Sequence, residues 1–193
     1  MSKKIFSPLV ITLAILVVLA LGAIGSYNSL VTLETNVDKT FADIETQYQR
    51  RFDLIPNIVN TAKGEANFEQ TTLQNVVAAR SAWAAAGTTN EKIDAANNFE
   101  GALSRLLVTV EAYPTLKATQ AYQDLITELE GTENRIAYAR SEFNTAATEY
   151  NKSVRQFPRN LIASVFKFDA KKELFQAANG ADVVPVVDFG VNQ

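Results

Sequence analysis

The sequence contains no histidine and no cysteine among its 193 residues. Without histidine, the chain cannot form a Ser-His-Asp triad, a zinc site of the ordinary kind or the Glu-x-x-His pairs of di-iron bundles. Without cysteine it cannot rely on disulfides, and it remains compatible with an oxidising compartment outside the cytoplasm. These two absences remove the commonest catalytic and metal-binding side chains.

Glycine is also scarce, with eight residues in the whole chain. The sequence has no GxGxxG or GxxxxGK motif that would cradle a phosphate, and no GxSxG motif that would carry a nucleophile. Carboxylates alone can bind Mg²⁺ or Ca²⁺, but the sequence has no Asp-rich loop of that kind. We therefore expect no catalytic residues, no cofactor and no metal site.

Charge is distributed unevenly along the chain. Lys3 and Lys4 precede a stretch without charge, and the first charges after it are Glu34 and Asp38. The part of the chain after residue 26 holds 16 basic and 21 acidic residues, so its formal charge is about −5. Nucleic-acid binding usually requires a clustered basic surface, whereas these basic residues are scattered among acidic ones. We expect no nucleic-acid partner.

The uncharged stretch over residues 5–26 reads IFSPLVITLAILVVLALGAIGS. Its length matches the roughly 20 apolar residues with which a helix crosses a hydrocarbon core of about 30 Å. The sequence therefore predicts a transmembrane anchor, with the lipid bilayer as its partner. Characteristic residues of this anchor are Ile5, Leu16, Gly22 and Ser26. Lys3 and Lys4 place a short N-terminus, residues 1–4, in the cytoplasm and the body of the chain outside.

Small residues near the end of this stretch allow two further interpretations. Residues around Ala20, Gly22 and Ala23 could serve a signal peptidase, so a cleaved secretory signal is the alternative to an anchor. The apolar run is longer than the usual signal core of ~7 to 15 residues, which favours the anchor. Gly22 and Ser26 have the small-xxx-small spacing that lets two membrane helices approach closely, which indicates a contact between anchors.

After the anchor, apolar residues recur in steps of mostly three and four. This spacing predicts one long helix that continues the anchor as a rod. The residues of this stripe are Leu30, Leu33, Val37, Phe41, Ile44, Tyr48, Phe52, Ile55 and Val59. Pro56 removes a backbone hydrogen bond, so we expect a kink there. Helical composition then continues over 57–80, with Gly64 as a weak point.

Two more long helices are predicted. The run SAWAAAGTTNE ends the preceding helix, and Asn90 is a candidate cap for a helix over 91–112. Tyr113-Pro114 ends that helix, because the residue before a proline is disfavoured in helical dihedrals. The helix after Pro114 carries a coiled-coil-like apolar seam for about five heptads, up to Phe157.

The C-terminal part of the chain changes character. Residues 160–168 predict a short amphipathic turn that either docks on the bundle or contacts the lipid surface near the anchor. Its apolar residues are Leu161, Ile162, Val165 and Phe166. From Gly180 the sequence is β-branched and has no helical period, which predicts an extended arm, either loosely packed or added to a partner.

Together these patterns predict an all-α fold. A transmembrane helix over 5–26 continues into an elongated antiparallel bundle over 27–168, which contains long coiled-coil-like helices. A short extended tail over 169–193 follows the bundle.

Three polar clusters lie beside the apolar seams at special points of the backbone. Their residues are Arg51, Asp53, Pro56 and Asn57 at the predicted kink; Glu111, Tyr113 and Pro114 at a helix end; and Glu133, Asn134, Arg135, Arg140 and Asn144 along the last long helix. A carboxylate opposes the dipole at the C-terminus of a helix, so we expect Glu111 to pair with an arginine across the bundle. Glu133 and Arg140 lie two turns apart, so each must find its partner on another helix.

These clusters have two interpretations. The first is a polar network between helices that fixes their register, in which removal of one member costs several kcal/mol because a partner charge is left desolvated. The second is a groove for a ligand or partner, lined by Arg51, Glu111 and Glu133.

Several segments of the chain resemble the bacterial LemA family. They are YNSLV from Tyr27, RRFDLIPNIV from Arg50, EAYPTLKA from Glu111 and LITELEGTENRIAYAR from Leu125. The most specific pieces are DLIPN and TENRI, and Phe143-Asn144 departs from the expected Tyr-Asn. The resemblance covers almost the whole chain and implies a membrane-anchored, elongated antiparallel helical bundle in the bacterial envelope. It implies no reaction, and the association of relatives with membrane organelle formation and membrane proteases favours a scaffold or adaptor.

We therefore expect a non-enzymatic, single-pass protein of the bacterial inner membrane. In this interpretation it self-associates through its anchor and long helices, and the homo-oligomer organises membrane or partner proteins as a scaffold. The alternative is a monomeric adaptor or ligand sensor beside a membrane protease or transporter.

Overall fold

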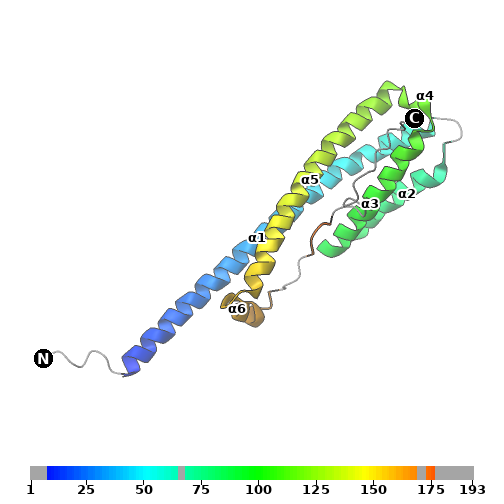
Figure 1. Cartoon of the computed structure of the whole chain (residues 1–193). Coiled ribbons are helices and arrows are strands. Elements are labelled where there is room, and N and C mark those ends of the chain that lie inside the picture. The colour runs from blue at the N-terminus through cyan, green and yellow to red at the C-terminus, as the bar shows by residue number, and fades with distance from the viewer. Residues whose placement is uncertain (1–7, 65–67, 169–172, 177–193) are drawn as a thin grey trace, which may run out of the picture.

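The computed structural model of the chain describes residues 8–64, 68–168 and 173–176, and the statements below concern these residues. All regular structure within them is helical, which confirms the predicted all-α fold (Figure 1). The six helices are α1 (Pro8–Lys63), α2 (Gln70–Ala85), α3 (Thr89–Val110), α4 (Pro114–Lys117), α5 (Gln120–Arg155) and α6 (Arg159–Phe166). Ile5 and most of the predicted tail lie outside the described residues, and residues 173–176 have no regular structure.

Helix α1 is a single helix of 56 residues with two different surfaces. Its first part is exposed around its whole circumference, with Leu16 58% exposed. From Leu30 onward, the residues of the predicted stripe are buried, apart from the partly buried Leu33. Pro56 lies inside the helix, which continues without interruption to Lys63. One unbroken element therefore carries both the apolar segment and one wall of the core.

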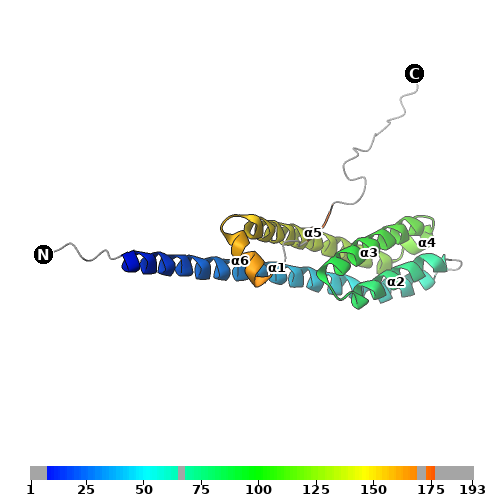
Figure 2. The same cartoon turned by 90° about the horizontal axis from the view of Figure 1, so that it is seen from below.

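Helix α5 runs antiparallel to α1 along most of the bundle (Figures 1 and 2). Its seam is buried nearly as predicted, and the buried members include Leu125, Leu129, Thr132, Ile136, Ala139, Phe143, Ala146, Tyr150 and Val154. Phe157 was predicted to close this seam, but it is 80% exposed because α5 ends at Arg155.

Helices α2 and α3 pack against each other at the end of the bundle far from the N-terminus (Figure 2). The cap of α3 is Thr88, and the predicted cap Asn90 lies inside the first turn. The Thr88 hydroxyl accepts a hydrogen bond from the Glu91 N–H at 3.2 Å, and the Glu91 carboxylate accepts one from the Thr88 N–H at 3.0 Å. Thr88 rather than Asn90 caps the helix, because Thr88 is in an extended conformation and Glu91 lies three residues later, as this reciprocal cap requires.

Two of the predicted helices are divided in the structure. The predicted helix over 57–80 is split, because α1 ends at Lys63 before Gly64 and α2 begins only at Gln70. The predicted helix after Pro114 begins as the single turn α4, and α5 starts anew after Thr119. The Thr119 hydroxyl accepts a hydrogen bond from the Tyr122 N–H at 3.3 Å and so caps the new helix.

Helix α6 lies against α1 and α5 near the end of the exposed apolar segment (Figures 1 and 2). The ring of Tyr27 on α1 lies 4.8 Å from the ring of Phe166 and 5.7 Å from that of Phe168. Ala163 is the buried residue of α6, whereas Val165 is 73% exposed. The contact with the bundle thus leaves most of the apolar side of α6 open.

Candidate functional site

Arg51 is the charged residue around which a cluster of polar side chains forms. It occupies a core position of α1, only 3% exposed, between Tyr48 and Ile55 on the buried stripe. Its Nη1 donates hydrogen bonds to both carboxylate oxygens of Glu100 on α3, each at 2.7 Å. Its Nη2 donates to the carboxylate of Glu133 on α5. One guanidinium therefore joins three helices.

Arg140 and Tyr48 extend this cluster on the other side of Glu100. Arg140 donates a hydrogen bond to the Tyr48 hydroxyl, which in turn donates to Glu100 Oε1 at 3.1 Å. A longer bond joins Arg140 Nη2 to the same oxygen at 3.4 Å. Glu100 is thus the common acceptor for Arg51, Tyr48 and Arg140, and the two arginines balance the two carboxylates of Glu100 and Glu133.

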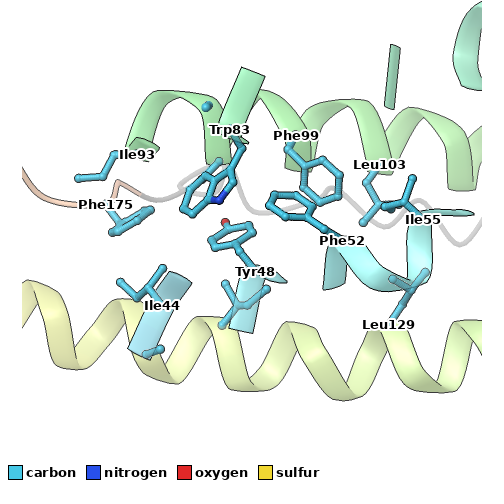
Figure 3. Close-up of a cluster of buried hydrophobic side chains, with 14 of the residues drawn as sticks. Ile44, Tyr48, Phe52, Ile55, Trp83, Ile93, Phe99, Leu103, Leu129 and Phe175 are labelled. Atoms are coloured by element: carbon cyan, nitrogen blue, oxygen red, sulfur yellow. The ribbon is translucent and has the colours of Figure 1, made fainter. Parts of the chain in front are cut away.

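Aromatic rings form an apolar wall beside Tyr48, one member of this cluster (Figure 3). Tyr48 lies 4.6 Å from Trp83 of α2 between ring centroids, and Phe52 lies 4.8 Å from Phe99 of α3 at nearly a right angle. Phe99 directly precedes Glu100 on α3, and its buried ring packs on Phe52 of α1, the helix that carries Arg51. The wall lowers the local dielectric and strengthens the hydrogen bonds inside it.

Burial changes the acidity of two groups in the cluster. Desolvation, followed by the nearby Glu100 charge, raises the pKa of Tyr48 well above its usual range, so the phenol remains neutral and can donate to Glu100. Desolvation also raises the pKa of Glu100, against the opposing attraction of Arg51. At Glu100 the cost of burial thus outweighs the attraction of the arginines, and the hydrogen bonds of the cluster run from one helix to the next.

The structure brings together three of the predicted site residues, Arg51, Glu133 and Arg140. The residue that sequence reasoning missed is Glu100, which joins them. A signal was present, because Glu100 lies four residues after Ala96 and three before Leu103 and so falls on the apolar face of α3. A carboxylate at a core position of a helix indicates a cationic partner.

The predicted partner of Glu111 was wrong. Its carboxylate pairs with Lys117 at 2.6 Å, and the side chain is 65% exposed. The lysine is six residues away along the chain, so this is a local surface ion pair rather than one across the bundle. Glu111 therefore does not line a groove with Arg51 and Glu133.

The other residues of the first two clusters have local roles. The Tyr113 ring lies 4.9 Å from that of Phe68, and Pro114 is the first residue of α4. Pro56 is exposed on α1. Asp53 and Asn57 are also exposed on α1; Asp53 accepts a hydrogen bond from Gln49 at 2.8 Å, and the Asn57 carbonyl accepts one from Thr61 at 2.8 Å.

The remaining predicted residues lie on two other faces of α5. Asn134 and Arg135 line a shallow groove of about 400 Å³ between α5 and α1. Asn144 faces the segment 173–176: its side-chain amide donates to the Phe175 carbonyl and accepts from the Phe175 N–H, both at 2.9 Å. The predicted third cluster is therefore divided among the charged cluster, this groove and the Phe175 contact.

The sequence profile of the LemA family matches residues 40–189. The magnetosome protein MamQ 2 of Paramagnetospirillum magneticum is 26% identical over 187 residues, covering 83% of this chain and 68% of that protein. Magnetosome protein MamQ of Magnetospirillum gryphiswaldense is 26% identical over 168 residues, which cover 74% of this chain and 62% of the relative. Protein LemA of Metamycoplasma hominis is 23% identical over 141 residues, covering 72% of this chain and 64% of that protein.

We predict that Arg51→Ala lowers the free energy of unfolding by about 3 to 5 kcal/mol, because the mostly buried Glu100 loses its strongest partner. The measurement is urea unfolding of the full chain in mild detergent, followed by circular dichroism. Glu133 is half exposed, so Glu133→Ala should cost less than about 1 kcal/mol. The exposed Arg135→Ala is the matched control. An Arg51→Ala chain as stable as the wild type would contradict a network that fixes register.

We also predict that the wild type loses stability relative to Tyr48→Phe as the pH rises above 10. In that range the unfolded chain releases the Tyr48 proton while the folded chain keeps it, so the unfolded state binds fewer protons and stability falls with pH. Unfolding of both chains at pH 8 to 11.5 measures the difference, since their other tyrosines cancel. Parallel pH profiles would rule out a raised Tyr48 pKa.

Proposed function

The chain belongs to the LemA family, and we propose that it is a non-enzymatic, single-pass membrane protein of the bacterial envelope that acts as a scaffold. In this proposal residues 5–26 cross the inner membrane, residues 1–4 are cytoplasmic and the bundle over 27–168 stands outside. The chain self-associates and holds other membrane proteins at a fixed distance from the bilayer.

The observation that carries this proposal is the continuity of α1. An 18-residue window of this helix has a mean hydropathy of 2.7, and none of that window is buried by the rest of the chain. Residues 8–26 extend for about 28 Å as a helix, close to the thickness of a hydrocarbon core. The same helix continues into the core from Leu30 without a linker. A bilayer is the environment in which such an exposed apolar surface is stable.

Helix α6 supports the same placement. Its contact with Tyr27 brings it to the residue that directly follows the anchor, at the level of the membrane surface. Its exposed apolar residues would face the interface there, together with basic residues that suit anionic headgroups. Residues 151–168 include Lys152, Arg155, Arg159 and Lys167 and no acidic residue. This is the predicted lipid contact, and it accounts for the weak burial of α6 against the bundle.

The anchor also supports self-association. A side chain built at Gly22 would meet nothing within 4 Å, so this position is open to another helix, and Ser26 one turn later is partly exposed. Small residues at this spacing allow close packing of helices in a bilayer. The exposed face of the anchor and the long helices together would form the contact between copies.

A second candidate function is a monomeric adaptor or ligand sensor beside a membrane protease or transporter. The observation that favours it is the reach of the charged cluster to the surface, since the Glu133 side chain is 48% exposed while its partner Arg51 is buried. A charged partner that competes for Glu133 would act directly on the bond between α1 and α5.

We predict that the full chain in mild detergent has a protein mass several times that of the monomer by light scattering, whereas a chain that begins at Tyr27 is monomeric. Gly22→Leu should shift the full chain toward the monomer, because the larger side chain prevents close approach of the anchors. Ala20→Leu is the matched control, since Ala20 lies about 200° around the helix from Gly22. A monomeric full-length chain would contradict the scaffold and favour the adaptor.

We predict further that α6 lies in the membrane interface. The natural chain has no cysteine, so Val165→Cys and Val108→Cys can each carry a single spin label, and these valines are similarly exposed at 73% and 69%. In phosphatidylglycerol vesicles the label at 165 should collide with lipid-dissolved oxygen, and the label at 108 with an aqueous nickel reagent. Leu16→Cys reports on the anchor independently. If the label at 165 collides with the aqueous nickel reagent as often as the label at 108, the contact of α6 with the membrane is disproved, but the anchor is not.

A further inference from the structure

We infer that the face of α5 around Asn144 is a peptide-binding site, which recognises residues 173–176 of this chain and accepts the same segment from a second copy. The observation is the paired contact between the Asn144 amide and the Phe175 backbone. One side chain donates to the Phe175 carbonyl and accepts from the Phe175 N–H, each at 2.9 Å. Those two bonds satisfy both backbone groups of a residue that has no regular structure of its own.

This pairing is a recognition geometry for extended peptides. An asparagine amide offers one donor and one acceptor in a plane, as a neighbouring strand does. It binds the backbone N–H and C=O of the central residue through hydrogen bonds that do not involve that residue's side chain. Selectivity must come from the side chain of that residue.

An aromatic slot receives that side chain. Phe175 is only 6% exposed and lies 5.7 Å from the Phe143 ring, edge to face. The Arg140 guanidinium lies 5.2 Å from the centroid of the Phe175 ring and 5.5 Å from that of Tyr48, so it contacts both rings. Figure 3 shows Phe175 in the same apolar cluster as Ile44 and Ile93. The slot therefore selects an aromatic residue, and its occupant packs on Arg140, one member of the charged cluster.

The groove beside the bound segment remains open. It has a volume of about 620 Å³, and its lining includes Ser141, Thr145 and Thr148 of α5 and Gln176 of the segment. The residues on its floor are small or polar, so a longer peptide can lie along α5 beyond Phe175 without displacing apolar side chains of the core.

Exchange between copies follows from the membrane anchor, and this step rests on the proposed function. Anchored copies share one orientation and one height above the bilayer, so the segment of one copy lies at the level of the site on its neighbour. Confinement to one membrane raises the effective concentration of the neighbour's segment at the site without any new contact. Residues 173–176 of this chain fit the slot in the structure. Since a second copy carries the same segment, we infer that a second copy is the partner.

The first test measures peptide binding to the full chain in mild detergent. A fluorescent peptide covering residues 169–180 should bind Phe175→Ala, whose own segment cannot fill the slot, at least tenfold more tightly than it binds the wild type. Adding Asn144→Ala should weaken this binding at least tenfold, whereas adding Asn134→Ala on the same helix should leave it unchanged. A peptide with alanine in place of Phe175 should not bind. Absence of saturable binding, or binding indifferent to Asn144→Ala, would overturn the site.

The second test asks whether copies exchange segments in a membrane. One copy carries Phe175→Ala and Ser141→Cys, and the other carries Asn144→Ala and Gln176→Cys, so a disulfide can join them only through the exchanged segment. We expect a heterodimer after mild oxidation in vesicles, and far less when Tyr138→Cys replaces Ser141→Cys. Association by light scattering without this crosslink would overturn the exchange and leave the anchor-based scaffold standing. A crosslink that forms between copies whose anchors do not associate would support the exchange of segments and contradict the anchor-based scaffold.

Discussion

The positive charge of Arg51 must be neutralised inside the bundle, and the rest of the structure is arranged to do so. A nearly buried guanidinium needs carboxylates to neutralise its charge, and Arg51 meets this need through its two Nη atoms, while its buried Nε has no hydrogen-bond partner among the described residues. Here Glu100 supplies a bidentate partner from α3 and Glu133 a single one from α5. A shift of α3 by one turn would remove Glu100, the main partner of this charge, whereas a shift of α5 would remove only the half-exposed Glu133. The ion pairs therefore specify above all the register of α3 on α1.

The kinds of contact between the helices also differ along the length of the bundle. The ion pairs of Arg51 lie where α1, α3 and α5 meet, whereas nearer the anchor the contacts are the Tyr27 rings with α6 and a hydrogen bond from Tyr150 to Glu34. The Phe175 segment covers Arg140 at the edge of this charged region. Displacement of that segment would uncover Arg140, so occupancy of the Asn144 site is physically linked to the hydrogen bonds that Arg140 makes with Tyr48 and Glu100.

Local sequence patterns were sufficient for the architecture but not for every contact. The stripe of α1 and the seam of α5 follow from helical periodicity, and Arg51 was identified because it is a charge next to such a stripe. Glu100 was missed because an acid on an amphipathic helix usually faces solvent. Thr88 was passed over for Asn90, although Glu91 three residues later identifies the true cap. The Asn144 contact joins residues 31 apart with no periodic pattern, so no local rule could have found it.

The absence of a break between the apolar segment and the bundle has a mechanical consequence. From residue 26 to Lys63, α1 extends for about 56 Å as a stiff arm. With its base embedded in a bilayer, a change of ~10° in helix tilt would displace the far end by roughly 10 Å, within the range of tilts that membrane helices adopt. Bilayer thickness and curvature would thus be converted into lateral position at the tip, where α2, α3 and α4 lie, as a lever converts a small rotation into a large travel.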